Sequence, residues 1–157
     1  MKISAKEEYG LRILLCIARS KGDKGMTIAQ IAEKEGLSHQ NVAKLCRVLR
    51  LNGLINSNRG QQGGYTLSKP ADQIVIGDIL NALDGKLFGQ EFCMDHSGMP
   101  KLCTNSVDCS IRSLWRVVQH SVDNVLNNLT LKDLISSEEN LYNVCKPLVE
   151  ETQGVNI

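Results

Sequence analysis

The chain has 157 residues, 42% of them hydrophobic and 4% aromatic, which suits one or two small domains with an aliphatic core. No apolar run approaches the ~20 residues of a membrane-spanning helix, and the charged residues 1–8 do not form a signal peptide, so we expect a cytoplasmic protein with no membrane partner. The net charge of +1 is uneven: residues 1–70 hold 12 Lys and Arg against 5 Asp and Glu, whereas residues 71–157 hold 6 against 12, which predicts a polyanionic partner for the N-terminal part alone.

Three amphipathic helices are predicted in the first 50 residues. Capping boxes begin the first helix at Ser4 and the second at Thr27. Gly36 suits the end of the second helix, and Ser38 can cap a third whose apolar residues follow a helical spacing up to Leu49. A short helix, a glycine turn and a second capped helix are typical of a helix-turn-helix.

A β-hairpin is predicted directly after the third helix. Strand-like segments at 54–57 and 65–67 flank a glycine-rich tip that carries Arg59. A helix-turn-helix followed by such a hairpin is a winged helix, and Pro70 closes it. We therefore predict a winged helix-turn-helix DNA-binding domain over residues 1–70.

The remaining residues, 71–157, are predicted to be mostly helical, so the fold class is mostly α. A helix begins near Ile76, a loop without periodicity covers about 86–110, and Ser110 can cap a long helix over about 110–129. The long helix carries an apolar stripe over roughly 30 Å, which favours a dimerisation helix over an internal core helix. In a C-terminal helical tail, Thr130 can start a further short helix and residues 136–139 can cap another.

The third predicted helix and the hairpin tip carry the candidate DNA-binding residues, away from the apolar stripe of the helix. These candidates are Ser38, Gln40, Asn41, Lys44, Arg47, Arg50 and Arg59. The two amides suit adenine edges in the major groove, and Lys44 suits guanine or a phosphate. The helix arginines suit backbone phosphates, and Arg59 can enter the minor groove. Ser38 can act as a helix cap or touch a phosphate.

Three of the six cysteines, Cys93, Cys103 and Cys109, cluster in one polar loop. Thiolates are soft donors that suit an iron–sulfur cluster, zinc or Cu(I), and three of them within 17 residues can wrap a compact centre. The paired Cys-x2-Cys knuckles of structural zinc sites are absent, which favours iron–sulfur over zinc, with free or redox-active thiols as a further alternative. Cys16 and Cys46 lie in amphipathic helical patterns and are predicted to be buried.

Three cysteines leave a fourth ligand position open. His96, the sequence-distant Glu8, water or a small thiol could fill it. Arg112 cannot, because a guanidinium group has no free lone pair. A labile fourth ligand suits a sensor, because an oxidant or nitric oxide can reach iron there.

Nearly the whole chain resembles the bacterial iron–sulfur winged-helix transcriptional regulators typified by IscR and NsrR. The resemblance rests on residues 1–4, 9, 49–54, 59–60, 63–65, 76–78, 114–115 and 128–131 and on the three loop cysteines. It implies a 2Fe–2S or 4Fe–4S cluster on those cysteines and a homodimer, joined by the long helix, that binds a palindromic operator in double-stranded DNA. Arg112 stands where IscR-like members have a histidine ligand, and the resemblance implies Glu8 of the partner subunit as the fourth ligand instead.

The sequence thus predicts an iron–sulfur cluster-dependent DNA-binding transcriptional regulator that senses cluster status, redox state or nitric oxide. One alternative is a zinc-bound or thiol-switch regulator without iron. Another is a cluster-carrying redox protein, which would not need a winged-helix DNA-binding domain. No nucleophile–base pair, phosphate loop or second cofactor motif indicates an enzyme.

Overall fold

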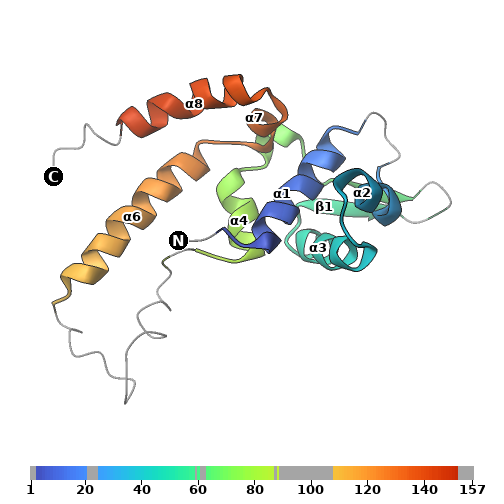
Figure 1. The fold of residues 1–157 in the computed structure, drawn as a ribbon, viewed down its shortest axis with the longest axis horizontal. Coiled ribbons are helices and arrows are strands. Elements are labelled where there is room, and N and C mark those ends of the chain that lie inside the picture. The colour runs from blue at the N-terminus through green and yellow to red at the C-terminus, as the bar shows by residue number, and fades with distance from the viewer. Residues whose placement is uncertain are drawn as a thin grey trace, which may run out of the picture.

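The computed structural model describes residues 3–20, 25–58, 60, 63–86, 88 and 108–151. Its elements, in chain order, are α1 (Ala5–Ala18), α2 (Ile28–Glu35), α3 (His39–Leu51), β1 (Ile55–Asn58), β2 (Gly64–Leu67), the 3-10 turn η1 (Ala71–Gln73), α4 (Ile76–Leu83), α6 (Ser110–Asn127), α7 (Leu131–Ile135) and α8 (Glu138–Glu151). The fold is mostly helical, as predicted (Figure 1). None of the helices in these ranges is long and apolar enough to span a lipid bilayer.

The predicted helix starts at Ser4 and Thr27 are confirmed. The Ser4 side chain accepts from the Glu7 amide, and the Glu7 carboxylate accepts from the Ser4 N–H at 2.8 Å, which closes the capping box. Thr27 and Gln30 form the same arrangement at α2. At the other end of α2, Gly36 has a φ of 66°, a left-handed conformation that glycine adopts without strain.

The helices α1, α2 and α3 pack around one aliphatic core. Its fully buried side chains include Ile13, Leu14, Ile31, Val42 and Leu49. Arg12 donates to the carboxylate of Glu35 at 3.0 Å and also to its carbonyl oxygen, which ties α1 to the end of α2. The predicted burial of Cys16 and Cys46 is confirmed, and desolvation raises the pKa of Cys46 to about 11. The Cys46 thiol therefore stays protonated and unreactive at neutral pH.

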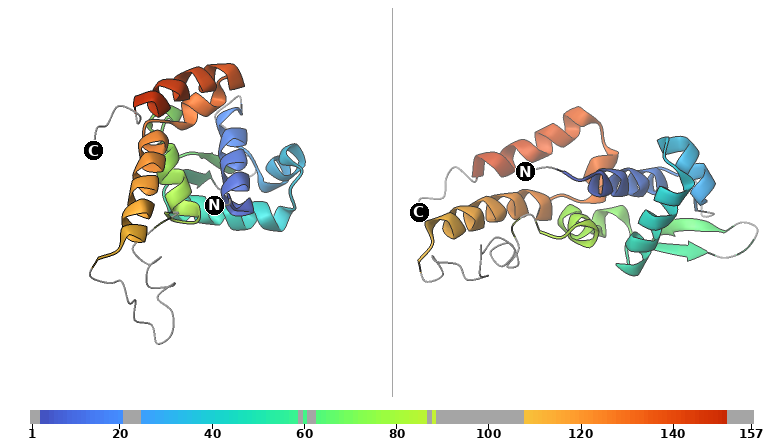
Figure 2. Two further views of the ribbon diagram at one scale, coloured as in Figure 1. Left: turned by 60° about the vertical axis from the view of Figure 1, so that its left-hand side comes forward. Right: turned by 60° about the horizontal axis from the view of Figure 1, so that its bottom comes forward.

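The predicted hairpin is confirmed: β1 lies one residue later than predicted, and β2 begins one residue earlier but ends at the predicted residue. β1 and β2 are antiparallel, and Ile55 lies opposite Leu67. Met26 bridges to Tyr65 through two backbone hydrogen bonds of 2.9 and 2.8 Å, which attach the hairpin to the segment before α2. The backbones approach so closely there that a Cβ on Gly64 would lie 2.9 Å from the Met26 nitrogen. The hairpin extends beside α3 (Figure 2).

The C-terminal helices confirm the predicted long helix, with one difference at its start. α6 covers 110–127, but its N-cap is Cys109 rather than the predicted Ser110. The C-terminal half of α6 lies beside α4, whereas its first turns project away from α4 (Figures 1 and 2). α8 contacts α6 and α7. Backbone bonds from Ile76 to Leu129 and from Leu131 to Ile74 join the starts of α4 and α7.

The predicted helix start at Thr130 is confirmed, and it leads to a pH-dependent prediction. Asp133 Oδ2 accepts from the Thr130 amide at 2.8 Å and from its hydroxyl at 2.7 Å, and these bonds lower the pKa of Asp133 from its ordinary 3.8. A carboxyl whose pKa is lower in the folded state stabilises the fold above its unfolded pKa, and this contribution is lost as the pH falls through the folded pKa. Asp133→Asn should therefore lower the free energy of unfolding by about 1 kcal/mol at neutral pH, and the deficit should shrink as the pH falls below about 4.

Urea denaturation of both proteins across this pH range measures the effect. Asp72→Asn is the matched control, because the ion pair of Asp72 with Lys132 is exposed and 3.8 Å long and should contribute little at any pH. A deficit for Asp133→Asn that is independent of pH would contradict the prediction.

Candidate nucleic-acid interface and metal centre

α3 carries a polar and basic face that is exposed to solvent. Its inward residues Val42, Leu45, Cys46 and Leu49 are buried. Its exposed residues include Gln40, Asn41, Lys44, Arg47 and Arg50. Because the two sets separate at helical spacing, the structure brings these five predicted DNA-contacting side chains to one face of α3.

Ser38 lies at the start of α3 and acts as its N-cap. Its backbone is extended, with φ −69° and ψ 146°, and its side-chain oxygen accepts from the Asn41 amide at 3.2 Å. The hydroxyl hydrogen can still donate to another acceptor. The capping role and a phosphate contact are therefore compatible.

The tip of the hairpin is shaped by glycines. Gly60 has a φ of 124°, and its carbonyl oxygen accepts from the Gly63 amide at 2.9 Å. A Cβ on Gly63 would overlap the carbonyl oxygen of Asn58, so this position requires glycine. Arg59, the predicted minor-groove residue, lies outside the described residues.

Of the three predicted cluster ligands, Cys109 is described, whereas Cys93 and Cys103 lie outside the described residues. Cys109 is half-buried, and its Sγ accepts from the backbone amide of Arg112 at 3.3 Å. The sulfur thus sits at the positive end of α6, an 18-residue helix, where a negatively charged ligand is stabilised. Cys109 therefore fits the thiolate donor that an iron–sulfur cluster or zinc requires. Elsewhere in the described ranges, no three His, Cys, Asp or Glu side chains gather in a group that could hold a metal ion.

Two neighbouring acids of α1 have different surroundings. Glu7 is buried, with 7% of its surface exposed, and is used in the capping box. Glu8, the predicted fourth ligand, is exposed and lines an apolar cavity of about 320 Å³ together with Leu11, Leu80 and Val122. The residues of α6 that line this cavity are Gln119, Val122, Asp123 and Leu126, which all lie in the later turns of that helix. Within one protomer, Glu8 and Cys109 thus belong to separate regions of the fold.

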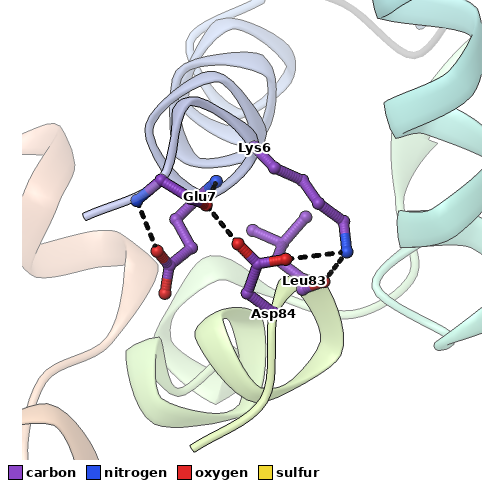
Figure 3. Close-up of polar contacts among 5 residues, drawn as sticks. Lys6, Glu7, Leu83 and Asp84 are labelled. Carbon is purple, nitrogen blue, oxygen red and sulfur yellow. Dashed lines mark hydrogen bonds and ion pairs between the residues drawn. The ribbon is translucent and has the colours of Figure 1, made fainter. Parts of the chain in front are cut away.

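The sequence analysis missed the polar contacts where the chain leaves α4 toward the cysteine-bearing loop. Asp84 accepts from the Ser4 hydroxyl and from the Lys6 ammonium at 3.1 Å (Figure 3). The Ser4 hydroxyl and then the Lys6 ammonium lower the pKa of the Asp84 carboxyl. Lys86 forms an ion pair with Asp123 of α6 at 3.2 Å. These partners are far apart in the chain, so no local sequence signal identifies them.

Comparison with known proteins gives consistent results. Residues 3–137 match the model of the Rrf2 family, described as an iron-dependent transcriptional regulator. The chain is 32% identical over 139 residues to the HTH-type transcriptional regulator IscR of Cronobacter sakazakii, covering 88% of this chain and 83% of the relative.

Solved structures agree with the family match. IscR of T. potens has a TM-score of 0.68 at 33% identity, covering 86% of each chain. CymR of Staphylococcus aureus, in its oxidized form, has a TM-score of 0.65 at 36% identity, covering 87% of this chain and 98% of that chain. The predicted resemblance and winged-helix fold class are therefore confirmed, and the chain belongs to the Rrf2 family of transcriptional regulators.

Proposed function

We propose that this regulator is a cytoplasmic homodimer, without enzymatic activity, whose affinity for a palindromic operator depends on an iron–sulfur cluster. Residues 1–70 bind DNA, and residues 71–157 bind the cluster and form the dimer. The observation that carries the proposal is the pairing of an exposed basic face on α3 with Cys109 at the positive end of α6. The iron-dependent description of the family and the similarity to IscR support it.

The DNA-binding role follows from the placement of the α3 side chains. Gln40 and Asn41 lie in the first turn of α3, where a recognition helix presents side chains to base edges in the major groove. Lys44 contacts guanine or a phosphate, and the later Arg47 and Arg50 contact phosphates, as does the Ser38 hydroxyl. Arg59, in the hairpin tip, enters the minor groove.

The metal site consists of Cys93, Cys103 and Cys109, with Glu8 of the partner subunit as the fourth ligand. A bound 2Fe–2S or 4Fe–4S cluster supplies a group that oxidants and nitric oxide can alter. Within the chain, the Arg112 amide and the N-terminus of α6 stabilise the charge on the Cys109 sulfur. The exposure of Glu8 leaves its carboxylate able to reach a second protomer.

The homodimer follows from the exposed apolar side chains on the projecting half of α6. Ile111, Leu114 and Val117 are 59%, 54% and 56% exposed. Three large apolar side chains at helical spacing on a projecting helix are a contact surface that a second copy can bury. The two-fold symmetry of the dimer presents two identical DNA-binding domains to the DNA. The operator must therefore be palindromic.

Anaerobic purification followed by DNA-binding measurements tests the proposed function. The protein should be coloured, should contain iron and sulfide, and should differ in operator affinity between cluster-loaded and cluster-free forms by roughly 5–150-fold. Equal affinities for the two forms would refute cluster-dependent regulation. A colourless, zinc-containing protein that binds the operator fully would show that the site holds zinc instead of an iron–sulfur cluster.

A thiol-switch regulator without iron is the second candidate, favoured by the similarity to CymR in its oxidized form. In this case the protein is colourless, and operator affinity follows reversible oxidation of cysteine thiols. Treatment with oxidant and then with a thiol reductant, in the absence of iron, distinguishes the two candidates, because only the thiol switch responds under these conditions.

Lys44→Ala should weaken operator binding and reduce its salt dependence. If Lys44 contacts one phosphate, its loss removes about one released counterion, so the slope of log affinity against log salt should become shallower by about 1. Fluorescence anisotropy with labelled operator at several salt concentrations measures the slope. Lys132→Ala, an exposed lysine on α7, is the control and should leave the slope unchanged. An unchanged slope for Lys44→Ala would remove Lys44 from the phosphate contacts.

A further inference from the structure

The segment after α4 leads to the cysteine-bearing loop and is attached to two different helices. Its described residues are Asp84, Gly85, Lys86 and Phe88, which we call the connector. One end of the connector is bound to α1, which belongs to the proposed DNA-binding domain (residues 1–70), here called the DNA-binding head. The other end is bound to α6, whose N-cap is Cys109.

The first attachment joins Asp84 to the first turn of α1. The Ser4 hydroxyl donates to Asp84 Oδ2, and Lys6 Nζ donates to Asp84 Oδ1 at 3.1 Å and to the Leu83 carbonyl oxygen (Figure 3). Ser4 is also the N-cap of α1. A shift of Asp84 therefore acts on the end of the helix whose buried face packs against α2 and α3.

The second attachment joins Lys86 and Phe88 to one face of α6. Lys86 Nζ lies 3.2 Å from Asp123 Oδ2, and the Phe88 amide donates to Gln119 Oε1 at 2.8 Å. Gln119 Nε2 donates to Asp123 Oδ1 at 2.8 Å, which links these two contacts. The Phe88 ring stacks on Trp115, with centroids 4.7 Å apart and planes 13° from parallel. The three α6 partners follow at intervals of four residues toward Cys109.

The two attachments are close together along the chain. Asp84 and Lys86 are two residues apart, so the backbone between them spans at most about 7 Å. Gly85 lies between them with a φ of 82°, a left-handed conformation that glycine adopts without strain. A movement of Lys86 along α6 that is larger than this short segment allows therefore also displaces Asp84.

We infer that Asp84 is a positioning residue that couples the cluster to the DNA-binding head. The inference rests on the proposed cluster-dependent function. The connector leads along the chain to Cys93 and Cys103, and Cys109 caps α6, so a centre bound by these three sulfurs would constrain the connector relative to α6. Loss of the centre releases this constraint, and the contacts of Asp84 with Ser4 and Lys6 pass the change to α1.

Operator affinities of the full-length Asp84→Ala protein, with and without the cluster, test the inference. The variant should load the cluster and, in its cluster-free form, bind the operator within about twofold of wild type. In wild type, the operator affinities of the cluster-loaded and cluster-free forms differ by a certain factor. In Asp84→Ala this factor should be at least about fivefold closer to one. Asp72→Ala, at the exposed pair with Lys132, is the matched control and should keep the wild-type ratio. Lys6→Met removes the other side of the contact and should reproduce the loss of coupling.

Trp115 is the single tryptophan, so its fluorescence reports on the connector without the cluster. Because coupling between sites is reciprocal, adding operator DNA to the cluster-free protein should change Trp115 emission in wild type and not in Asp84→Ala. The inference would be overturned if Asp84→Ala and Lys6→Met both kept the wild-type affinity ratio and if operator DNA changed Trp115 emission in Asp84→Ala as it does in wild type. The proposed function would still stand in that case. A ratio of one in wild type would overturn the proposed function together with the inference.

Discussion

Cys109→Ser should abolish the iron–sulfur cluster while leaving the fold intact. Cys109 caps α6 through its side chain, and serine is among the most favourable N-cap residues, so the helix start is preserved. The serine oxygen is a harder donor than the thiolate and binds a cluster poorly. Anaerobically purified Cys109→Ser should lack the visible absorbance band, and its operator affinity should stay at the wild-type cluster-free value.

Two further variants separate the ligand role of Cys109 from its capping role. Cys109→Ala should lose the absorbance band and also about 1 kcal/mol of unfolding free energy, measured by urea denaturation, because alanine cannot cap α6. Cys145→Ser is the control, since Cys145 is half-buried on α8 and lies outside the cysteine cluster. It should keep the band. Retention of the full band by Cys109→Ser would exclude Cys109 from the ligand set.

The helix starts at Ser4, Thr27 and Thr130 could be predicted because capping depends on residues three positions apart. The same rule failed at α6. Serine is a common N-cap and cysteine is not, so the sequence pattern indicated Ser110, whereas the chain uses the sulfur of Cys109. The error matters for function, because the capping atom is also the proposed metal donor.

Contacts between distant segments could not be predicted from local patterns. Periodicity marks Asp84 only as a residue at the end of a helix, yet its partners Ser4 and Lys6 lie about 80 positions earlier in the chain. Likewise, adjacent acids in a helix carry no sequence signal for burial, and only the packing of α1 distinguishes buried Glu7 from exposed Glu8. Residue type and spacing therefore predicted the DNA-binding helix and the set of metal ligands. The contacts that connect these two parts of the chain could be identified only from the tertiary structure.

Leu114→Glu should convert the proposed homodimer into a monomer. Leu114 is 54% exposed in the single protomer, so the substitution leaves the monomer core intact. In the dimer both copies of the leucine are buried, and losing about 2 kcal/mol from each copy weakens association roughly a thousandfold. Burial of two carboxylates adds to this cost. Sedimentation velocity should show a dimer for wild type and a monomer for Leu114→Glu at micromolar concentration, with equal helix content by circular dichroism.

The monomeric variant should also lose most of its operator affinity. Two DNA-binding heads joined through α6 bind a palindromic operator as one unit. Separating them removes a gain in operator affinity of about 10²–10⁴-fold. Leu51→Glu is the control for oligomeric state, because Leu51 is 69% exposed at the end of α3, away from the α6 surface. It should remain a dimer. If Leu114→Glu sedimented as a dimer, α6 would not be the dimerisation surface, and Glu8 would lose its proposed route to the cluster of a second protomer.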